Sequence, residues 1–193
     1  MNIIIKFDSR EVERALREAP KAVEKAAIRT LNKVGSQANT AISKALRDKY
    51  NIKKKRIDLA STVRKASNSS LAYELSSRER TPGLQHYSAN KTGKGVTVKI
   101  ISTSGRKVVK GGFMANTPQG AIAVWKTKKE SARIMKSGRY RGTGIWKVPI
   151  KRLYGPSVPG MINSIGINLF EKVVTEKFDK VFSHEFNWEM SKR

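Results

Sequence analysis

Residues 139–161 read RYRGTGIWKVPIKRLYGPSVPGM, and we expect the rest of the chain to be organised around this stretch. Within it, 145–153 alternates in the way that a β-strand does. Pro149 has no N–H, so this strand is predicted at a sheet edge, near a strand start or at a bulge. Two turn-forming pairs follow, Gly155-Pro156 and Pro159-Gly160. A helix is therefore expected from about Met161.

A basic edge strand beside a rigid exit loop is the kind of surface on which a neighbouring subunit docks. The alternative is a hairpin arm followed by an irregular connector. Under the docking interpretation, the candidate subunit-interface residues are Trp146, Pro149, Tyr154, Pro156 and Pro159.

With 193 residues and no Cys, the chain is long enough for one domain with a core of its own and has neither disulfides nor thiolate metal sites. Its opening residues, MNIIIKFDS, lack the apolar core of a signal peptide, and no window approaches the ~20 apolar residues of a membrane span. We therefore expect a soluble protein that is not secreted and does not meet a membrane.

Charge is the strongest compositional feature. Forty Lys and Arg against fifteen Asp and Glu give a net charge of +25. Residues 71–162 hold eighteen basic and three acidic residues, whereas 163–193 hold five of each. Because such a charge makes the free chain repel itself, we expect a polyanion or an acidic partner.

The N-terminal region is predicted to be helical. A short strand over 3–5 leads to Ser9, a candidate N-cap, and apolar residues then recur every three or four positions to about Tyr50. Pro20 interrupts this pattern, so the main helix is expected from Pro20 to Arg47. A second short helix is expected over 53–62.

The run NIKKKR, residues 51–56, places four cations after the main helix. Such a run is either a solvated surface or a contact for phosphates. A second basic region, 127–144, is expected to form an exposed loop. With the separate pair Arg64-Lys65, these regions supply the candidate contacts for DNA or an acidic partner: Lys53, Lys54, Lys55, Arg56, Arg64, Lys65, Arg139 and Arg141.

The centre of the chain changes to a period of two, which predicts an antiparallel meander. The expected strands are 71–75, 96–100, 107–110, 113–115 and 121–125. The end returns to a helical pattern over 161–186, with one apolar face. Trp188 would then lie on a short tail, either frayed or anchored on a partner.

Catalytic chemistry has little support. His86 and His184, the two histidines, are far apart in the chain, and 71–162 holds only three acids. No nucleophile elbow, phosphate-binding loop or zinc motif occurs. We expect no enzyme, no cofactor and no metal, and any contact with nucleic acid should be with phosphates, independent of sequence.

Taken in order, the long helix, YNIKKKRI (50–57), RKAS (64–67), GGFMA (111–115) and VPIKRLYGPSVP (148–159) resemble the phage minor tail protein Z family, of the tail-completion and head–tail connector type. The resemblance covers nearly the whole chain, and PIKRLYGPSVP is its most specific segment. The basic loop 127–144 shows no family pattern, and the chain has no acidic stretch between its strands.

This resemblance implies an α+β subunit in which a long N-terminal helix and a C-terminal helix pack on an antiparallel sheet. We expect a single domain over 1–193, with a helical N-terminal region over 1–66, a sheet over 71–155 and a helix over 161–186. The implied role is structural: a virion protein of the phage tail or neck, assembled in the host cytoplasm. Six copies would form a ring around the DNA channel.

The implied partners are other copies of the chain, the tail terminator, tail tube or neck and connector proteins, and the double-stranded DNA. Two alternatives remain. One is a free protein that binds and compacts double-stranded DNA without reading its sequence, and the other is a hydrolase, for which no acid can be nominated.

Overall fold

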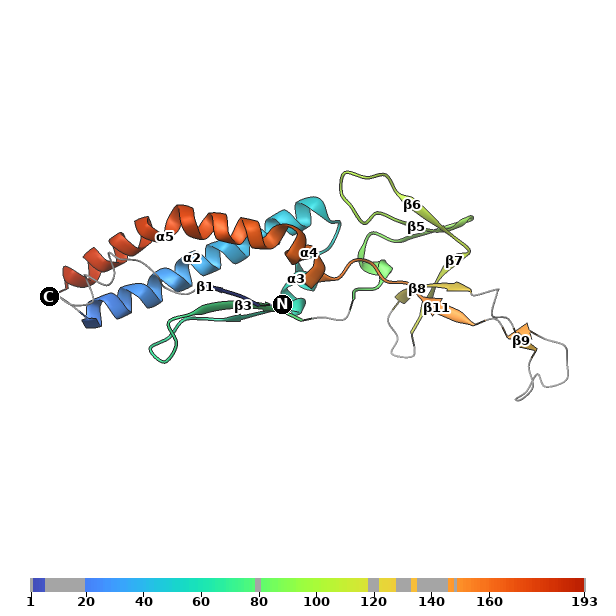
Figure 1. Ribbon diagram of the computed structural model, residues 1–193. Helices are drawn as coiled ribbons and strands as arrows, with labels where there is room; N and C mark the ends of the chain where they lie inside the picture. Colours follow the sequence, from blue (N-terminus) through green and yellow to red (C-terminus); the bar gives the residue numbers. More distant parts are fainter. Residues whose placement is uncertain are drawn as a thin grey trace. The chain divides into compact units, whose positions relative to one another are not determined.

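The computed structural model describes residues 2–5, 20–78, 81–117, 122–127, 133–134, 146–147 and 149–192. These residues form helices and antiparallel sheets, with a long helix in the N-terminal region and another at the C-terminus (Figure 1). The predicted α+β class is therefore confirmed. The predicted Ser9 cap and most of the loop 127–144 lie outside the described residues.

The chain divides into two compact units. The first, called the helical unit, comprises 1–48, 53–80 and 157–193. The second, called the β unit, comprises 49–52 and 81–156. Compactness does not establish independent folding, so the expectation of a single domain stays a prediction.

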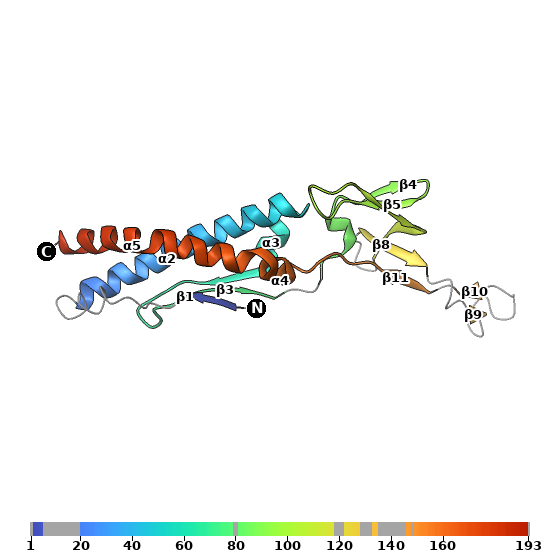
Figure 2. The ribbon, with the colours of Figure 1, turned by 45° about the horizontal axis from the view of Figure 1, so that its top comes forward.

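The helical unit contains two long helices and a small sheet. Helix α2 (Pro20–Lys49) lies beside helix α5 (Ile167–Met190), and the sheet has the order β1 (Asn2–Ile5), β3 (Tyr73–Ser77), β2 (Ser61–Arg64) (Figures 1 and 2). Shorter elements complete it: α3 (Lys54–Ala60), α4 (Val158–Met161) and the π-helical turn η3 (Ile162–Gly166). Both strand pairs are antiparallel.

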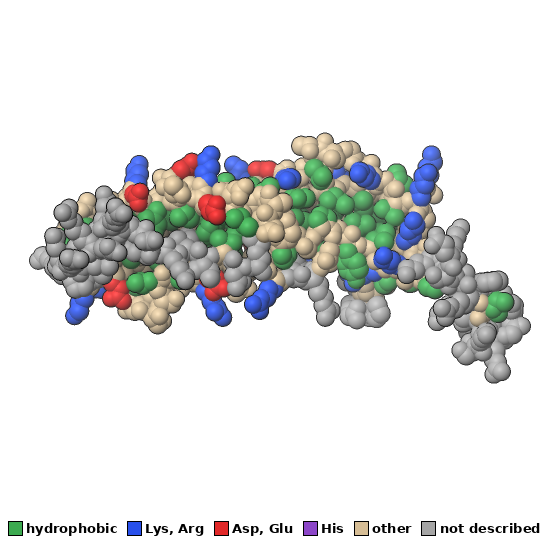
Figure 3. Space-filling model, viewed as in Figure 1, with side chains coloured by type: hydrophobic (Ala, Val, Ile, Leu, Met, Phe, Trp, Pro, Cys, Tyr) green, Lys and Arg blue, Asp and Glu red, His purple; other side chains and the backbone are tan. Residues whose placement is uncertain are grey.

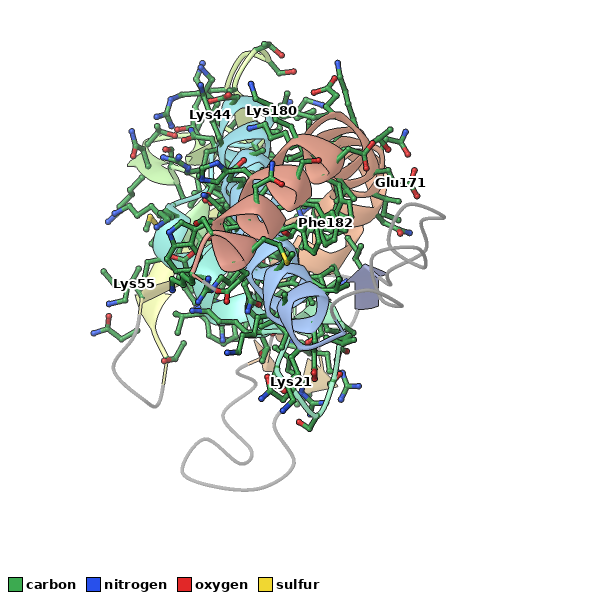
Figure 4. All side chains as sticks on the ribbon, turned by 90° about the vertical axis from the view of Figure 1, so that its left-hand side faces the viewer. Lys21, Lys44, Lys55, Glu171, Lys180 and Phe182 are labelled. Atoms are coloured by element: carbon green, nitrogen blue, oxygen red, sulfur yellow. The ribbon has the colours of Figure 1, made fainter. Side chains whose placement is uncertain are left out.

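The core of this unit follows from the apolar stripe of α2. Small side chains of α2 let α5 approach, and Phe182 of α5 packs against Val23 and two alanines (Figure 4). Phe178, Phe182 and Phe186 stack in series, with ring centroids 6.3 and 6.1 Å apart. The helix pair is thus held by apolar burial and aromatic stacking. The buried residues of α2 are Ala22, Val23, Ala26, Ala27, Thr30, Leu31, Val34, Gly35, Ala38, Ile42, Ser43 and Leu46.

Helix α2 meets the sheet at Gly35, which faces the ring of Tyr73. A Cβ at position 35 would lie 2.5 Å from two atoms of that ring. Tyr73 is buried, and burial raises the pKa of its phenol. Nearby, the Asn32 amide donates to the Ala66 carbonyl at 3.0 Å and accepts from the Ala66 N–H at 2.8 Å. Glycine at 35 is therefore required by the close approach of the helix to the sheet.

Two expectations for this unit were wrong in detail. The short helix ends at Ala60 instead of Thr62, because 61–64 pairs with β3 as strand β2. Trp188 lies within α5, not on a frayed tail, and the guanidinium carbon of Arg29 is 4.2 Å from its ring centroid. Arg29 also forms an ion pair with the buried Glu189, which ties the end of α5 to α2.

The β unit contains two three-stranded antiparallel sheets. The first has the order β4 (Asn90–Thr92), β5 (Gly95–Val98), β6 (Lys107–Lys110), and the second β7 (Gly112–Asn116), β8 (Ile122–Thr127), β11 (Ile150–Arg152), arranged β11-β8-β7. A short 3₁₀ turn, η1 (Leu84–His86), precedes them. The antiparallel strands expected in this region are present, but the prediction of one meander over 71–125 is wrong. Residues 73–77 form β3, which pairs with β1 and β2 in the helical unit, and the later strands divide between separate sheets because β6 does not pair with β7.

The single strand expected over 145–153 is divided in the structure. Strand β10 (Trp146–Lys147) pairs with β9 (Arg133–Ile134), whereas β11 pairs with β8. Pro149 lies between the two strands, just before β11, which is at a sheet edge. Placement of this proline at a strand start on an edge agrees with the sequence analysis, and its missing N–H explains the division.

The segment after β11 is anchored by backbone hydrogen bonds. Leu153 donates to the Val124 carbonyl at 2.9 Å and accepts from Leu84 at 3.0 Å, and Gly155 donates to Pro82 at 2.8 Å. The Tyr87 hydroxyl donates to the Pro156 carbonyl at 2.6 Å. A Cβ at Gly155 would enter the Tyr87 ring, which is fully buried. The chain then begins α4, where Ser157 caps the helix by accepting from the Gly160 N–H at 3.2 Å.

Replacement of Gly35 by Ala should destabilise the protein. Overpacking against Tyr73 costs roughly 1–3 kcal/mol and exceeds the helix propensity gained, about 1 kcal/mol, so a net loss near 1 kcal/mol is expected. Chemical denaturation followed by circular dichroism would measure it. The control is Ser36→Ala at the exposed next position, which should be neutral or slightly stabilising. A Gly35→Ala variant as stable as this control would contradict the close approach.

Replacement of Gly155 by Ala should cost roughly 1–3 kcal/mol, because the added methyl group has no space beside the Tyr87 ring. Tyr87→Phe keeps the ring but loses the hydrogen bond to Pro156, for about 1 kcal/mol. Thermal unfolding of both variants would test this order. Equal stability of Gly155→Ala and the wild type would show that the ring does not pack on Gly155.

Candidate polyanion-binding surface

Positive charge is divided unequally between the two units. By sequence, the β unit carries 17 Lys and Arg against one acid, Glu130, whereas the helical unit carries 23 against 14 acids. Figure 3 shows carboxylates over the helical unit and none on the visible face of the described residues of the β unit. The β unit therefore has almost no internal counter-charge and is the stronger candidate for a polyanion contact.

The predicted basic run lies at the start of α3. Lys53, Lys54 and Lys55 are exposed, and Arg56 is half-buried. Lys54 lies 3.7 Å from Asp58, one helical turn away. The run is thus a solvent-exposed surface, as either interpretation of the sequence required, and its three lysines remain accessible to an anion.

The remaining predicted cations are separated from this run or lie outside the described residues. Arg64 is on β2 directly opposite Glu74 of β3, with a nitrogen–oxygen distance of 3.8 Å. Lys65 is exposed beside it. Arg139 and Arg141 lie outside the described residues.

The predicted interface residues have varied surroundings. Tyr154 is 52% exposed, and the guanidinium carbon of Arg152 lies 5.5 Å from its ring centroid. Pro149, Pro156 and Pro159 are half-buried, and Pro159 stands in the first turn of α4. Trp146 lies in β10. Pro156 and its neighbour Gly155 thus have a structural role within their own chain, and docking at these residues stays a prediction.

The structure adds a pair of cations that the sequence analysis did not nominate. Lys126 of β8 and Lys151 of β11 are direct cross-strand partners, and both are exposed. The side chains of such partners project from the same face of a sheet, with Cβ atoms about 4.5–5.5 Å apart. Two like charges at this spacing repel, so an anion bound between them would stabilise the pair.

A second pair of basic residues is opposed in the neighbouring strand pair, β9 with β10. Arg133 of β9 is the cross-strand partner of Lys147 of β10. In chain order β8 and β9 come before β10 and β11, and we call these four strands, 122–127, 133–134, 146–147 and 150–152, the hairpin strands. The sequence alone does not show which residues are cross-strand partners. The sequence analysis therefore identified a basic region but not these pairs of cations.

No candidate metal site or membrane-spanning helix occurs among the described residues. They contain no group of three His, Cys, Asp or Glu side chains placed to hold a metal ion. Over the same residues, no helix is both long and apolar enough to cross a membrane. Exposed lysines are flexible donors that can neutralise phosphates without reading a sequence.

Comparisons of this chain with models of protein families, with curated proteins and with solved structures found no match.

Proposed function

We propose that this protein is a structural, non-enzymatic virion subunit that completes the tail of a long-tailed phage at its head-proximal end. Six copies form a ring around the DNA channel. The ring helps tail completion, head–tail joining and DNA passage, in contact with the tail terminator, the tail tube or neck and connector proteins. The protein is assembled in the host cytoplasm and resides in the virion.

The observation that carries this proposal is the separation of charge between the two units. A unit with 17 cations and one acid suits a polyanion, whereas one with 23 cations and 14 acids suits protein contacts better. The order of the elements supports it too: a long helix, a basic run, antiparallel strands, then the IKRLYGPSVP segment leading into a C-terminal helix.

Exposed apolar side chains further support a role in an assembly. In the helical unit, Leu59 is 63% exposed, and Val63 and Leu71 are also exposed. In the β unit, Ile122 and Ile150 are each more than half exposed. Single exposed apolar residues are ordinary, but several on such a basic chain are consistent with burial against neighbouring subunits.

The second candidate function is a free protein that binds and compacts double-stranded DNA. The total charge of +25 favours it as much as it favours the ring. The two candidate functions predict different DNA affinities for the free monomer. A compacting protein must bind any duplex strongly as a monomer, whereas a ring subunit gains its affinity from several copies acting together.

Deletion of this protein from the phage that encodes it should leave heads and tails that do not join, or joined particles that do not deliver DNA. Electron microscopy of the particles, with a count of infectious units, would measure both. Expression of the protein from a plasmid during infection should restore infectivity. Intact, fully infectious particles without the protein would remove the structural role and favour the compacting protein.

Replacement of Lys53, Lys54 and Lys55 by Gln should reduce assembly or DNA retention without unfolding the chain. These lysines are exposed, and the one ion pair lost, to Asp58, is worth at most about 0.5 kcal/mol. Circular dichroism would check the fold, and complementation of the deleted phage would measure the function.

The matched control replaces three exposed lysines of α5, Lys172, Lys177 and Lys180, by Gln, which changes the charge equally. Equal loss in both variants would mean that total charge, not the basic run, matters. Loss of folding in the first variant would exclude a channel-facing role for the run.

A further inference from the structure

We infer that the lysine pair of the β unit, Lys126 of β8 and Lys151 of β11, contacts the phosphate backbone of double-stranded DNA. This inference rests on the proposed function, in which DNA passes the ring, and it names the region of the subunit that meets the DNA. The sequence analysis gave this role to the run 53–56 and to single arginines of the loop.

The proposed contact consists of the pair Lys126 and Lys151. These residues are cross-strand partners on β8 and β11, and both side chains are exposed. Gly112 of β7, the partner of Lys126 on its other side, has no side chain to compete for the same anion. Two flexible ammonium groups on one face of a sheet can reach one phosphate together or two successive phosphates.

The opposite face of the same sheet carries no lysine among the described residues of β8 and β11. Trp125 and Arg152, the next pair in register, are half-buried. The Trp125 indole N–H donates to the Ala115 carbonyl at 3.3 Å, and Arg152 lies over the Tyr154 ring. The alternation of the strands therefore leaves the lysine face as the one that presents free ammonium groups to a ligand.

The same arrangement recurs at the second pair of strands, where the register sets Arg133 opposite Lys147. Over 122–152 the sequence has ten Lys and Arg and a single acid, Glu130. The helical unit shows the contrasting case, because its sheet places the cation Arg64 opposite an acid, Glu74. In register, basic residues are therefore opposite basic residues in both strand pairs, β8 with β11 and β9 with β10.

Basic residues opposed in two strand pairs favour a polyanion with regularly repeated charges over an acidic protein patch. Duplex DNA carries one negative charge per about 3.4 Å of each strand, so strands that carry opposed basic residues can follow its backbone. The lysines of this pair suit a contact that does not depend on the DNA sequence. Their ammonium groups act as flexible point charges, whereas the guanidinium group of arginine has a fixed planar geometry.

The test measures the binding of the purified full chain to a fluorescently labelled duplex of arbitrary sequence, by anisotropy, between about 50 and 200 mM salt. Each phosphate contact contributes about 0.9 to the slope of log affinity against log salt, so Lys126→Gln with Lys151→Gln should lower the slope by about 1.8. The matched control is Lys44→Gln with Lys180→Gln, on exposed positions of α2 and α5, which should leave the slope unchanged (Figure 4).

A third variant separates binding from folding. Lys126→Glu places opposite charges across β8 and β11, so it should raise the midpoint of thermal unfolding while weakening DNA binding. Equal slopes for the double variant at Lys126 and Lys151 and for the wild type would overturn the inference, as would a wild-type chain that does not bind the duplex at the lowest salt.

These outcomes are distinct from failure of the proposed function, which is decided by particles lacking the protein. If the double variant at Lys126 and Lys151 binds DNA normally but no longer joins heads to tails, the lysine pair contacts an acidic protein neighbour and the DNA assignment is wrong. If the deleted phage is fully infectious while the slope changes as expected, the DNA contact stands and the ring does not.

Discussion

The seating of the Tyr87 ring on Gly155 is the constraint on which the β unit depends. The ring is fully buried, its hydroxyl donates to the Pro156 carbonyl, and no side chain larger than hydrogen fits at position 155. Backbone hydrogen bonds from 153–155 to β8 and to 82–84 hold the same segment from both sides. This clamp fixes where β11 ends, and hence which of its residues lie opposite those of β8.

That register decides the electrostatics. A shift of one residue would place Lys151 on the other face of the sheet from Lys126, because successive side chains of a strand point to opposite faces. With the register held, two ammonium groups face the same solvent without an acid of their own unit among the described residues. The repulsion between them, about 0.2–1 kcal/mol for a directly opposed pair, is small beside the burial energy of the sheet. The fold can therefore keep the two lysines side by side, and a bound anion would relieve the repulsion between them.

The helical unit uses its charges differently. Its two long helices are joined by apolar burial and by the stacked phenylalanines, and its cations are often satisfied locally, as in Arg29 with Glu189 and Lys33 with Glu185. Gly35 and the alanines of α2 allow the close approach of the sheet and of α5. The helical unit is therefore the more nearly neutral of the two, and the β unit keeps almost all of its positive charge uncompensated.

The sequence by itself determined the elements that depend on local periodicity and on single residues: the helix from Pro20, the presence of short antiparallel strands in the centre of the chain, and the position of Pro149 at a sheet edge. It also determined the charge, since that is a count. The tertiary structure alone decided that 145–153 divides between two partners, that 61–64 leaves the helix to pair with β3, and that Trp188 stays helical against Arg29. It alone placed Lys126 opposite Lys151, because register is set by contacts between distant segments and no local pattern specifies it.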